Sequence, residues 1–180
     1  MKRAKRLKKL PNDTVYDEID SPVGKLVIFA SSQGVHSILW DKERFTKECK
    51  QVLLRFKQNS DHKIIIRTKQ QVTEYFQGKR KKFELPLVFD GTPFQIQAWK
   101  ELYKIPYGQT ISYAEQARRV GNKNKARAVG LANGLNPISI IVPCHRVLGS
   151  NGQLTGFGGG IENKKLLLQL EKNVLGKNND

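Results

Sequence analysis

The segment that most constrains the fold of this chain is residues 137–147, PISIIVPCHRV, where a short apolar run precedes an adjacent cysteine and histidine. Residues 138–142 are rich in β-branched side chains and have a proline on each side. We therefore predict a short core strand or extended segment that stops at Pro143. Cys144 would then lie where the rigid core ends.

Cys144 has the first requirement of a nucleophile, a base nearby in the sequence. A thiol is mostly protonated near neutral pH, so a reactive cysteine needs a neighbour that takes its proton, and His145 is the nearest candidate. Neighbouring residues in an extended chain point to opposite sides. A water that bridges the two side chains is therefore favoured over a direct hydrogen bond.

The charge of the chain points to a polyanionic partner. Its 32 lysines and arginines against 16 acidic residues give a formal net charge of +16. Such a field attracts nucleic acid, which is the leading candidate partner. A basic surface that serves solubility or stability at high temperature is the alternative.

Several classes of protein are disfavoured. The two cysteines, Cys49 and Cys144, are too few for a disulfide framework, and three scattered histidines complete no metal site, so we predict no metal. No apolar run approaches the ~18 residues of a membrane span, and no apolar signal region follows the lysine-rich start. We expect no membrane association and an intracellular location, in the cytoplasm with the nucleoid, or in the nucleus of a eukaryote.

The first half of the chain predicts a small α/β domain over residues 11–90, after a disordered basic arm at 1–10. Turn signals separate three runs of β type, which predicts an antiparallel meander. The three runs are Thr14–Asp20, Lys25–Ala30 and Gly34–Trp40. Residues 64–66 could add a strand and residues 72–76 a short helix. The basic tetrad 79–82 is either a solvated loop or a phosphate contact.

An amphipathic helix is predicted around Cys49. The apolar residues that set its spacing are Phe45, Cys49, Val52, Leu53 and Phe56. Because a free cysteine on an apolar helical stripe behaves as a small hydrophobe, we expect Cys49 to be a buried structural thiol.

The second half, residues 91–180, predicts a mainly helical domain, with the boundary near 86–91. Thr92-Pro93 begins a helix that stops at 105–108. Ser112 and Glu115 predict a capping box for the next helix. Residues 125–133 are predicted to form a further short helix. This pair is typical of a helix-turn-helix, whose alanines and neighbouring basic residues favour a DNA groove over simple tight packing.

Two features follow the cysteine. Residues 149–160 contain six glycines and predict a loop that brings backbone donors close to a flat ligand, although it is no Walker loop. The last helix begins near Ile161 and carries Glu171, whose carboxylate could orient a histidine or could lie on the surface near the helix end.

Taken together, these motifs closely resemble the O6-methylguanine-DNA methyltransferases, also called alkylguanine-DNA alkyltransferases. The residues that carry the resemblance are Pro143–Val147, Ala126–Gly130, Asn136-Pro137 and Glu171. Residues 91–175 match in order and spacing, and Ser21–Gly24 matches the amino-terminal domain more loosely. The resemblance implies transfer of an alkyl group from O6 of guanine in double-stranded DNA to Cys144, without a cofactor, by a protein that is consumed. We expect a monomer.

The resemblance also assigns roles. It makes Cys144 the acceptor and His145 the base that acts through water, oriented by Glu171, with Asn136 as a hinge that couples DNA contact to the cysteine. Arg127 would fill the stack after the nucleotide is flipped out, and Tyr113 would help rotate the target phosphate. Small or basic residues on the helix-turn-helix would face the minor groove: Lys125, Ala126, Ala128 and Gly130.

The predicted substrate pocket departs from the family pattern. Its residues are Tyr113, Val147, Phe157, Gly158 and Gly159. Phe157 replaces the tyrosine of many members, and Gly158 replaces the serine of some, which predicts a roomier and less polar pocket. The amino-terminal half, with only Cys49, His36 and His62, lacks the zinc site of some relatives.

The same residues separate alkyl transfer from three other functions. An alkyltransferase-like protein that binds damage without transfer resembles this fold but lacks the cysteine, so Cys144 favours the enzyme. A sequence-specific regulator would need base-reading side chains on residues 125–133, which are rich in alanine. A cysteine hydrolase has no further mark of an acyl-transfer site. Transfer from O4 of thymine stays open.

Overall fold

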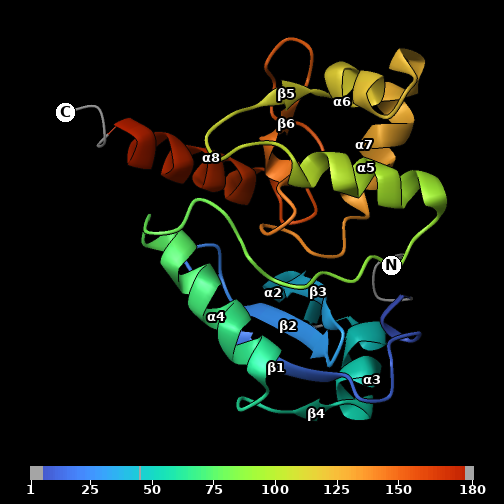
Figure 1. The fold of residues 1–180 in the computed structure, drawn as a ribbon, viewed down its shortest axis with the longest axis vertical. Helices are drawn as coiled ribbons and strands as arrows, with labels where there is room; N and C mark the ends of the chain where they lie inside the picture. The colour runs from blue at the N-terminus through green and yellow to red at the C-terminus, as the bar shows by residue number, and fades with distance from the viewer. Residues whose placement is uncertain (1–5, 45, 177–180) are drawn as a thin grey trace. The chain divides into compact units, whose positions relative to one another are not determined.

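The computed structural model describes residues 6–44 and 46–176, which form two compact units that meet in sequence at Asp90 and Gly91 (Figure 1). No helix of the described residues combines the length and the apolar character that a membrane span requires. Each unit is described by itself below.

The first unit is built on a four-stranded sheet of order β3-β2-β1-β4 (Figure 1). The strands are β1 Val15–Ile19, β2 Leu26–Ser31, β3 Gly34–Trp40 and β4 Lys57–Gln58. The first three form the predicted antiparallel meander, which is confirmed. The two-residue β4 pairs in parallel with β1, so the sheet is mixed rather than purely antiparallel.

Beyond residue 10, the described residues of the first unit form the helices α2 Asp41–Arg44, α3 Lys47–Arg55 and α4 Lys63–Phe76. The strand expected at residues 64–66 is wrong, because these isoleucines lie in the first turn and a half of α4. Ile65, Thr68, Val72 and Tyr75 are all buried on one side of this helix. Helical periodicity over 14 residues therefore outweighs the β preference of a short isoleucine run.

The core of the first unit includes part of the predicted basic arm. Leu7 and Leu10 are buried in the same apolar cluster as Val27 and Cys49. The arm is therefore shorter than ten residues, because two leucines three positions apart pack their side chains into the core. Cys49 is fully buried, as predicted, and Phe45 lies outside the described residues.

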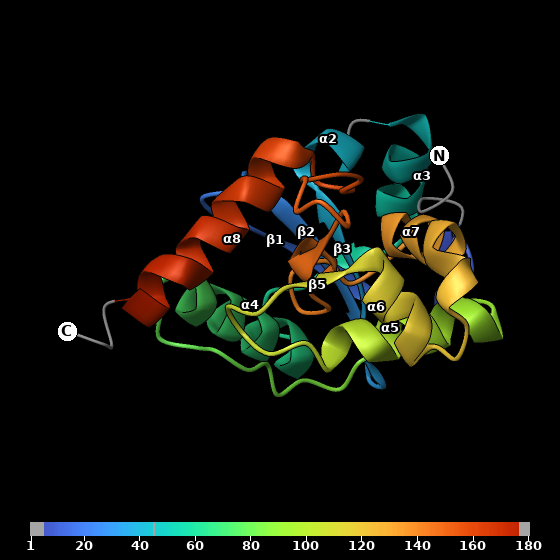
Figure 2. The same ribbon diagram turned by 90° about the horizontal axis from the view of Figure 1, so that it is seen from above.

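Over residues 91–176, the second unit contains four α-helices, two short 3-10 helices and a two-stranded parallel pair. Its elements are α5 Pro93–Tyr103, β5 Ile111–Ser112, α6 Tyr113–Arg119, η1 Lys123–Lys125, α7 Ala126–Gly134, η2 Cys144–Arg146, β6 Val147–Leu148 and α8 Ile161–Gly176. In both ribbon views α8 lies on the other side of the β5–β6 pair from α5, α6 and α7 (Figure 1 and Figure 2). η2, which contacts α8 and leads directly into β6, thus lies between α8 and the other three helices.

Caps and side-chain bonds fix α5 and the two helices of the helix-turn-helix. Thr92 caps α5 with a reciprocal box to Gln95, and Ser112 caps α6 by accepting from the backbone N–H of Glu115. Only this half of the predicted box at Ser112 forms, because the Glu115 carboxylate binds Arg118 and Arg119 instead. Trp99 Nε1 donates to the Ala132 carbonyl at 2.8 Å and so ties α5 to α7.

The predicted strand at residues 138–142 is wrong. This segment is a buried turn in which Ile140 has a φ of 76° and the Val142 N–H donates to the Ile138 carbonyl at 2.9 Å. A β-branched residue with positive φ is costly, and the fold holds Ile140 there with its side chain fully buried. The apolar run therefore folds back on itself instead of entering a ladder.

Candidate alkyl-transfer site

Cys144 begins η2 directly after the buried turn. Cys144 is 3 % exposed, and its backbone N–H donates to the Val142 carbonyl at 2.9 Å. The turn closes with a hydrogen bond from the Arg146 N–H to the Pro143 carbonyl at 3.0 Å. Cys144 and His145 are thus consecutive residues of a 3-10 helix and not of the extended chain that the sequence indicated.

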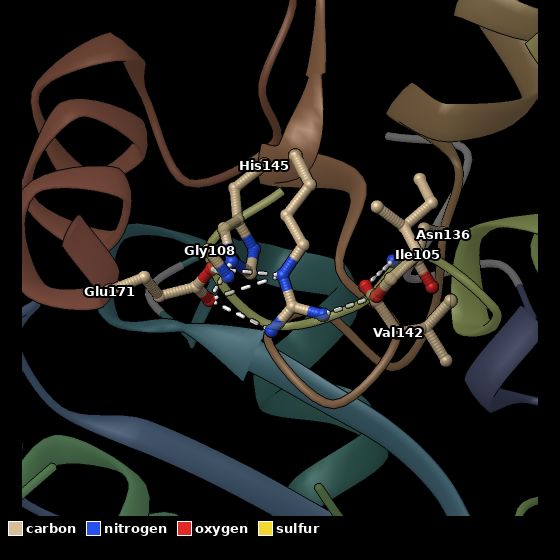
Figure 3. A network of polar contacts seen from close by, with 7 residues as sticks. Ile105, Gly108, Asn136, Val142, His145 and Glu171 are labelled. Atoms are coloured by element: carbon tan, nitrogen blue, oxygen red, sulfur yellow. Dashed lines mark hydrogen bonds and ion pairs between the residues drawn. The ribbon is translucent and has the colours of Figure 1, made fainter. Parts of the chain in front are cut away.

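Asn136 holds the two sides of this turn together (Figure 3). Its side-chain amide donates to the Val142 carbonyl at 2.8 Å and to Cys144 Sγ at 3.3 Å. Its side-chain oxygen accepts from the Ile138 N–H at 3.1 Å. An amide N–H directed at the sulfur stabilises a thiolate more than a thiol, because it favours the charged form.

His145 and Glu171 form a fully buried pair. His145 Nε2 lies 2.8 Å from Glu171 Oε1, and both residues have no exposed surface (Figure 3). Glu171 is held by further donors: the Gly108 N–H at 2.8 Å, and Arg146 Nη2 at 2.9 Å. Three residues from two segments of the chain, Gly108 and the adjacent pair 145–146, thus converge on one carboxylate.

The charges of this pair follow from its surroundings. Burial opposes ionisation of Glu171, but the hydrogen bonds and charges of His145 and Arg146 outweigh it and lower its pKa to about 2. Burial lowers the pKa of His145, and this outweighs the pull of Glu171 in the other direction. At neutral pH the site therefore holds a carboxylate beside a neutral imidazole.

The carboxylate also selects the imidazole tautomer. An ionised carboxylate only accepts hydrogen bonds, so Nε2 of the neutral ring carries the proton and donates it to Glu171. Nδ1 is then the ring nitrogen with the free lone pair. This atom is buried and has no hydrogen-bond partner among the described residues. The basic nitrogen of His145 is therefore available to a solvent molecule or a substrate proton.

Arg146 and Lys164 are two buried cations that the sequence reasoning missed. Besides Glu171, Arg146 donates to the Ile105 carbonyl at 2.6 Å. Lys164 has no exposed surface, and its Nζ donates to the carbonyls of Val147 at 2.6 Å and Thr155 at 2.8 Å. Burial lowers the pKa of Lys164, and electrostatic attraction to Cys144 opposes that shift.

A signal for Lys164 exists in the sequence. Lys164, Leu167 and Glu171 are all buried on α8 and follow a spacing of three and four residues, so a lysine stands on an apolar helical stripe. A lysine is almost never fully buried unless its ammonium has partners. Arg146 stands next to the cysteine and histidine, but its partners come from residues 105 and 171 and are visible only in the fold.

Tyr113 links α6 to the glycine-rich loop. Its hydroxyl donates to the Thr155 carbonyl at 3.1 Å, the carbonyl that Lys164 also binds, and the Lys164 ammonium lies 5.8 Å from the centre of its ring. The other predicted pocket residues differ in access. Val147 is fully buried, whereas Phe157, Gly158 and Gly159 are partly exposed. The Phe157 ring meets the His145 ring edge to face at 6.4 Å.

The predicted DNA-contacting residues lie along α7 and its start. Arg127 and Lys125 are exposed, and Ala126, Ala128 and Gly130 are partly exposed. A Cβ added to Gly130 would lie 3.7 Å from the Tyr113 ring, so this face of α7 borders the reactive site. Among residues 6–44 and 46–176, no group of three or more His, Cys, Asp or Glu side chains is arranged to hold a metal ion.

Comparison with known proteins gives consistent matches to both units. Residues 93–173 match the family model for the 6-O-methylguanine DNA methyltransferase DNA-binding domain, and residues 14–89 match the ribonuclease-like domain of the same proteins. A methylated-DNA–protein-cysteine methyltransferase of Methanosarcina barkeri is 41% identical over 160 residues, which cover 89% of this chain and 98% of the relative.

Solved structures agree with these matches. The chain is similar to the O6-methylguanine methyltransferase of Mycobacterium tuberculosis, with a TM-score of 0.79 and 42% identity over 89% of this chain and 93% of the other. A crystal structure of the mycobacterial protein in complex with DNA gives a TM-score of 0.77, with 42% identity over 88% of this chain and 93% of the other.

Proposed function

Because this chain belongs to the O6-methylguanine-DNA methyltransferase family, as two family models and relatives over 40% identical show, we propose that Cys144 is the residue that receives the alkyl group. The protein repairs DNA by direct transfer from O6 of guanine to a cysteine of its own chain. One observation carries the assignment to Cys144: its thiol accepts a hydrogen bond from the Asn136 amide, and the next residue is a neutral histidine that Glu171 orients.

The chemistry is a displacement at carbon. The Cys144 thiolate donates an electron pair to the alkyl carbon, a carbon–sulfur bond forms, and the electrons of the carbon–oxygen bond stay on O6. The guanine takes up a proton and is restored. The thioether has no good leaving group, and water cannot return it to the thiolate, so each molecule reacts once without a cofactor.

His145 is proposed to supply the thiolate. Nδ1 carries the lone pair because Nε2 donates to Glu171, so Nδ1 can take the Cys144 proton through one water. The imidazolium that forms is stabilised by the Glu171 carboxylate, whose pKa of about 2 keeps it ionised. Glu171 thus has two roles, since it fixes the tautomer and neutralises the new charge.

DNA presentation is proposed to use α7. Arg127, at the second residue of α7, would occupy the space that the flipped nucleotide leaves, and small neighbours would allow the helix to approach the minor groove. Asn136 lies between the end of α7 and Cys144, and we propose that it couples the two as a hinge. Tyr113 of α6, whose ring lies beside Gly130 of α7, would act on the target phosphate.

The pocket is proposed to accept O6-alkylguanine, with O4-alkylthymine as a further candidate. Phe157 offers no hydroxyl to the base, so stabilisation of the leaving oxygen would rest on loop amides and on Tyr113. We propose that the protein acts as a monomer. Damage binding without transfer is the competing function, and the presence of Cys144 favours transfer.

Intact mass spectrometry tests this proposal. After incubation with duplex DNA that contains one O6-methylguanine, the protein should gain one methyl group, which peptide mapping should place on Cys144. Cys144→Ala should still bind this duplex and gain nothing. Several turnovers per molecule, or a methyl group on Cys49, would overturn the assignment, and tight binding by the unmodified chain without any mass change would support the damage-binding alternative.

A further inference from the structure

The exposed face of α7 carries one large apolar side chain that no role above explains. Leu131 is 69 % exposed, the most of the large apolar residues described in the second unit. Its neighbours Val129, Ala132 and Asn133 are buried against the rest of the unit. Leu131 therefore contributes little to folding, since its surface stays in contact with water in the free protein.

Leu131 shares the face of α7 that Arg127 occupies. The two residues are four positions apart, one helical turn, and both are exposed. Helical side chains lean towards the amino-terminal end, so Leu131 covers the surface between its own Cα and Arg127. Whatever receives the Arg127 side chain must therefore also meet Leu131.

Two glycines stand close to Leu131. Gly130 precedes it and Gly134 lies one turn later, and a Cβ added at Gly134 would meet nothing within 4 Å. With glycines on these two sides, the leucine projects from the helix, and the partly exposed Leu135 follows one turn further on. This is the shape of a side chain that enters a narrow space, unlike the broad apolar surface that binds a folded protein.

The charge beside Leu131 identifies the class of partner. Lys123, Lys125 and Arg127 are exposed at the start of the helix, so the partner is anionic along its edge and apolar between its charges. The DNA minor groove meets both conditions, because phosphates line its edges and deoxyribose faces line its walls. Minor-groove proteins insert leucine or similar side chains at base steps.

We propose that Leu131 is a second insertion residue, which packs in the minor groove beside Arg127 and helps to hold the target nucleotide out of the stack. This inference rests on the proposed function and adds a residue to it. An uncharged wedge contributes through apolar contact, so its effect belongs to duplex DNA and not to the reaction of a free base. It should also be independent of salt, since leucine releases no counterions.

The test compares Leu131→Ala with Leu54→Ala, because Leu54 is an 89 % exposed leucine on α3 of the first unit. Single-turnover transfer should be measured on O6-methylguanine duplex and on free O6-benzylguanine. Leu131→Ala should slow duplex transfer about tenfold, leave the free-base rate unchanged and keep the salt slope of binding. Leu54→Ala should match the unmodified protein, and Leu131→Met should retain most of the duplex rate.

The outcomes separate the inference from its premise. If the unmodified protein transfers nothing to Cys144, the proposed function fails and the inference fails with it. If it transfers normally but Leu131→Ala has the full duplex rate, only the inference fails. An equal slowing on duplex and free base would likewise overturn it, because it would place Leu131 in the chemistry or the fold.

Discussion

The two cysteines of this chain lie in opposite kinds of interior. Cys49 is buried in the first unit among apolar side chains such as Val27, Phe29 and Val52. Cys144 is buried in the second unit beside an amide, a histidine and the field of a buried lysine. Both thiols are almost inaccessible in the free protein. Burial therefore says little about reactivity, and the neighbouring polar groups decide it.

This polar interior is costly to assemble. Glu171, His145, Arg146 and Lys164 are all buried, and each has a partner that offsets the loss of water. Buried ion pairs contribute little net stability, but removal of one member leaves an uncompensated charge. The second unit thus maintains a costly polar network beside Cys144, which the proposed mechanism uses, whereas the first unit packs its cysteine among apolar side chains.

The largest expected effect comes from the base beside Cys144. His145→Ala should lower the single-turnover rate by about a hundredfold or more at pH 7, because the thiol then ionises unaided. The rate should recover in part as the pH rises towards ~8.5, which is the pKa of an unperturbed thiol. Rates from pH 6 to 9 on free O6-benzylguanine measure this without DNA binding. A constant ratio to the unmodified protein at every pH would contradict the role of base.

Glu171→Gln tests whether the network is catalytic or structural. The pKa of Glu171 is lowered to about 2 from 4.5, so its stabilising contribution is present above pH 4.5 and is lost as the pH falls towards 2. The free energy of unfolding of the glutamine variant should be about 3 kcal/mol lower than that of the unmodified protein at pH 7. This difference should shrink on acidification to pH 3. Hydrogen exchange should be measured separately in peptides of each unit, and it should rise only in peptides of residues 91–176.

The transfer rate decides the role of Glu171. Glu171→Gln should give a weaker version of the His145→Ala defect, because the imidazole loses its orientation and its counter-charge. If this variant transfers at the normal rate across the pH range and only its stability falls, Glu171 belongs to the scaffold.

Lys164→Met sharpens the contrast between the two thiols by removing a charge. The ammonium attracts the Cys144 thiolate and holds the carbonyls of Val147 and Thr155. Its loss should slow transfer about tenfold and move the rising limb of the pH–rate profile to higher pH. The exposed neighbour gives the control, Lys165→Met, which should change neither. A slower rate with an unmoved pH profile would show that Lys164 only positions the loop.

The smallest effect is expected in the first unit. Cys49→Ala should leave the transfer rate unchanged and cost about 1 kcal/mol of stability, because it removes one sulfur from an apolar cluster. Hydrogen exchange should rise only in peptides of residues 6–90. A slower transfer rate in this variant would mean that the two cysteines are coupled.

Local signals predicted most of the fold. Thr92-Pro93 and Ser112 mark helix starts by caps that act within one turn, and the meander strands are separated by turns that also act locally. The errors occur where a short run has two readings. Residues 64–66 joined a longer helix because the periodicity of 14 residues outweighs three isoleucines. Residues 138–142 became a turn that is held by its own backbone bond and by the Asn136 side chain.

The sequence by itself determined the reactive pair, because Cys144 and His145 are adjacent, and the family pattern pointed to Asn136 and Glu171. Only the tertiary structure decided which groups surround these residues. It brings Gly108, Arg146 and His145 to one carboxylate on α8, and it buries Lys164 beneath Tyr113. The physical reason is that charge and burial depend on neighbours that lie up to 63 positions apart in the chain, a separation at which no periodic pattern records contact.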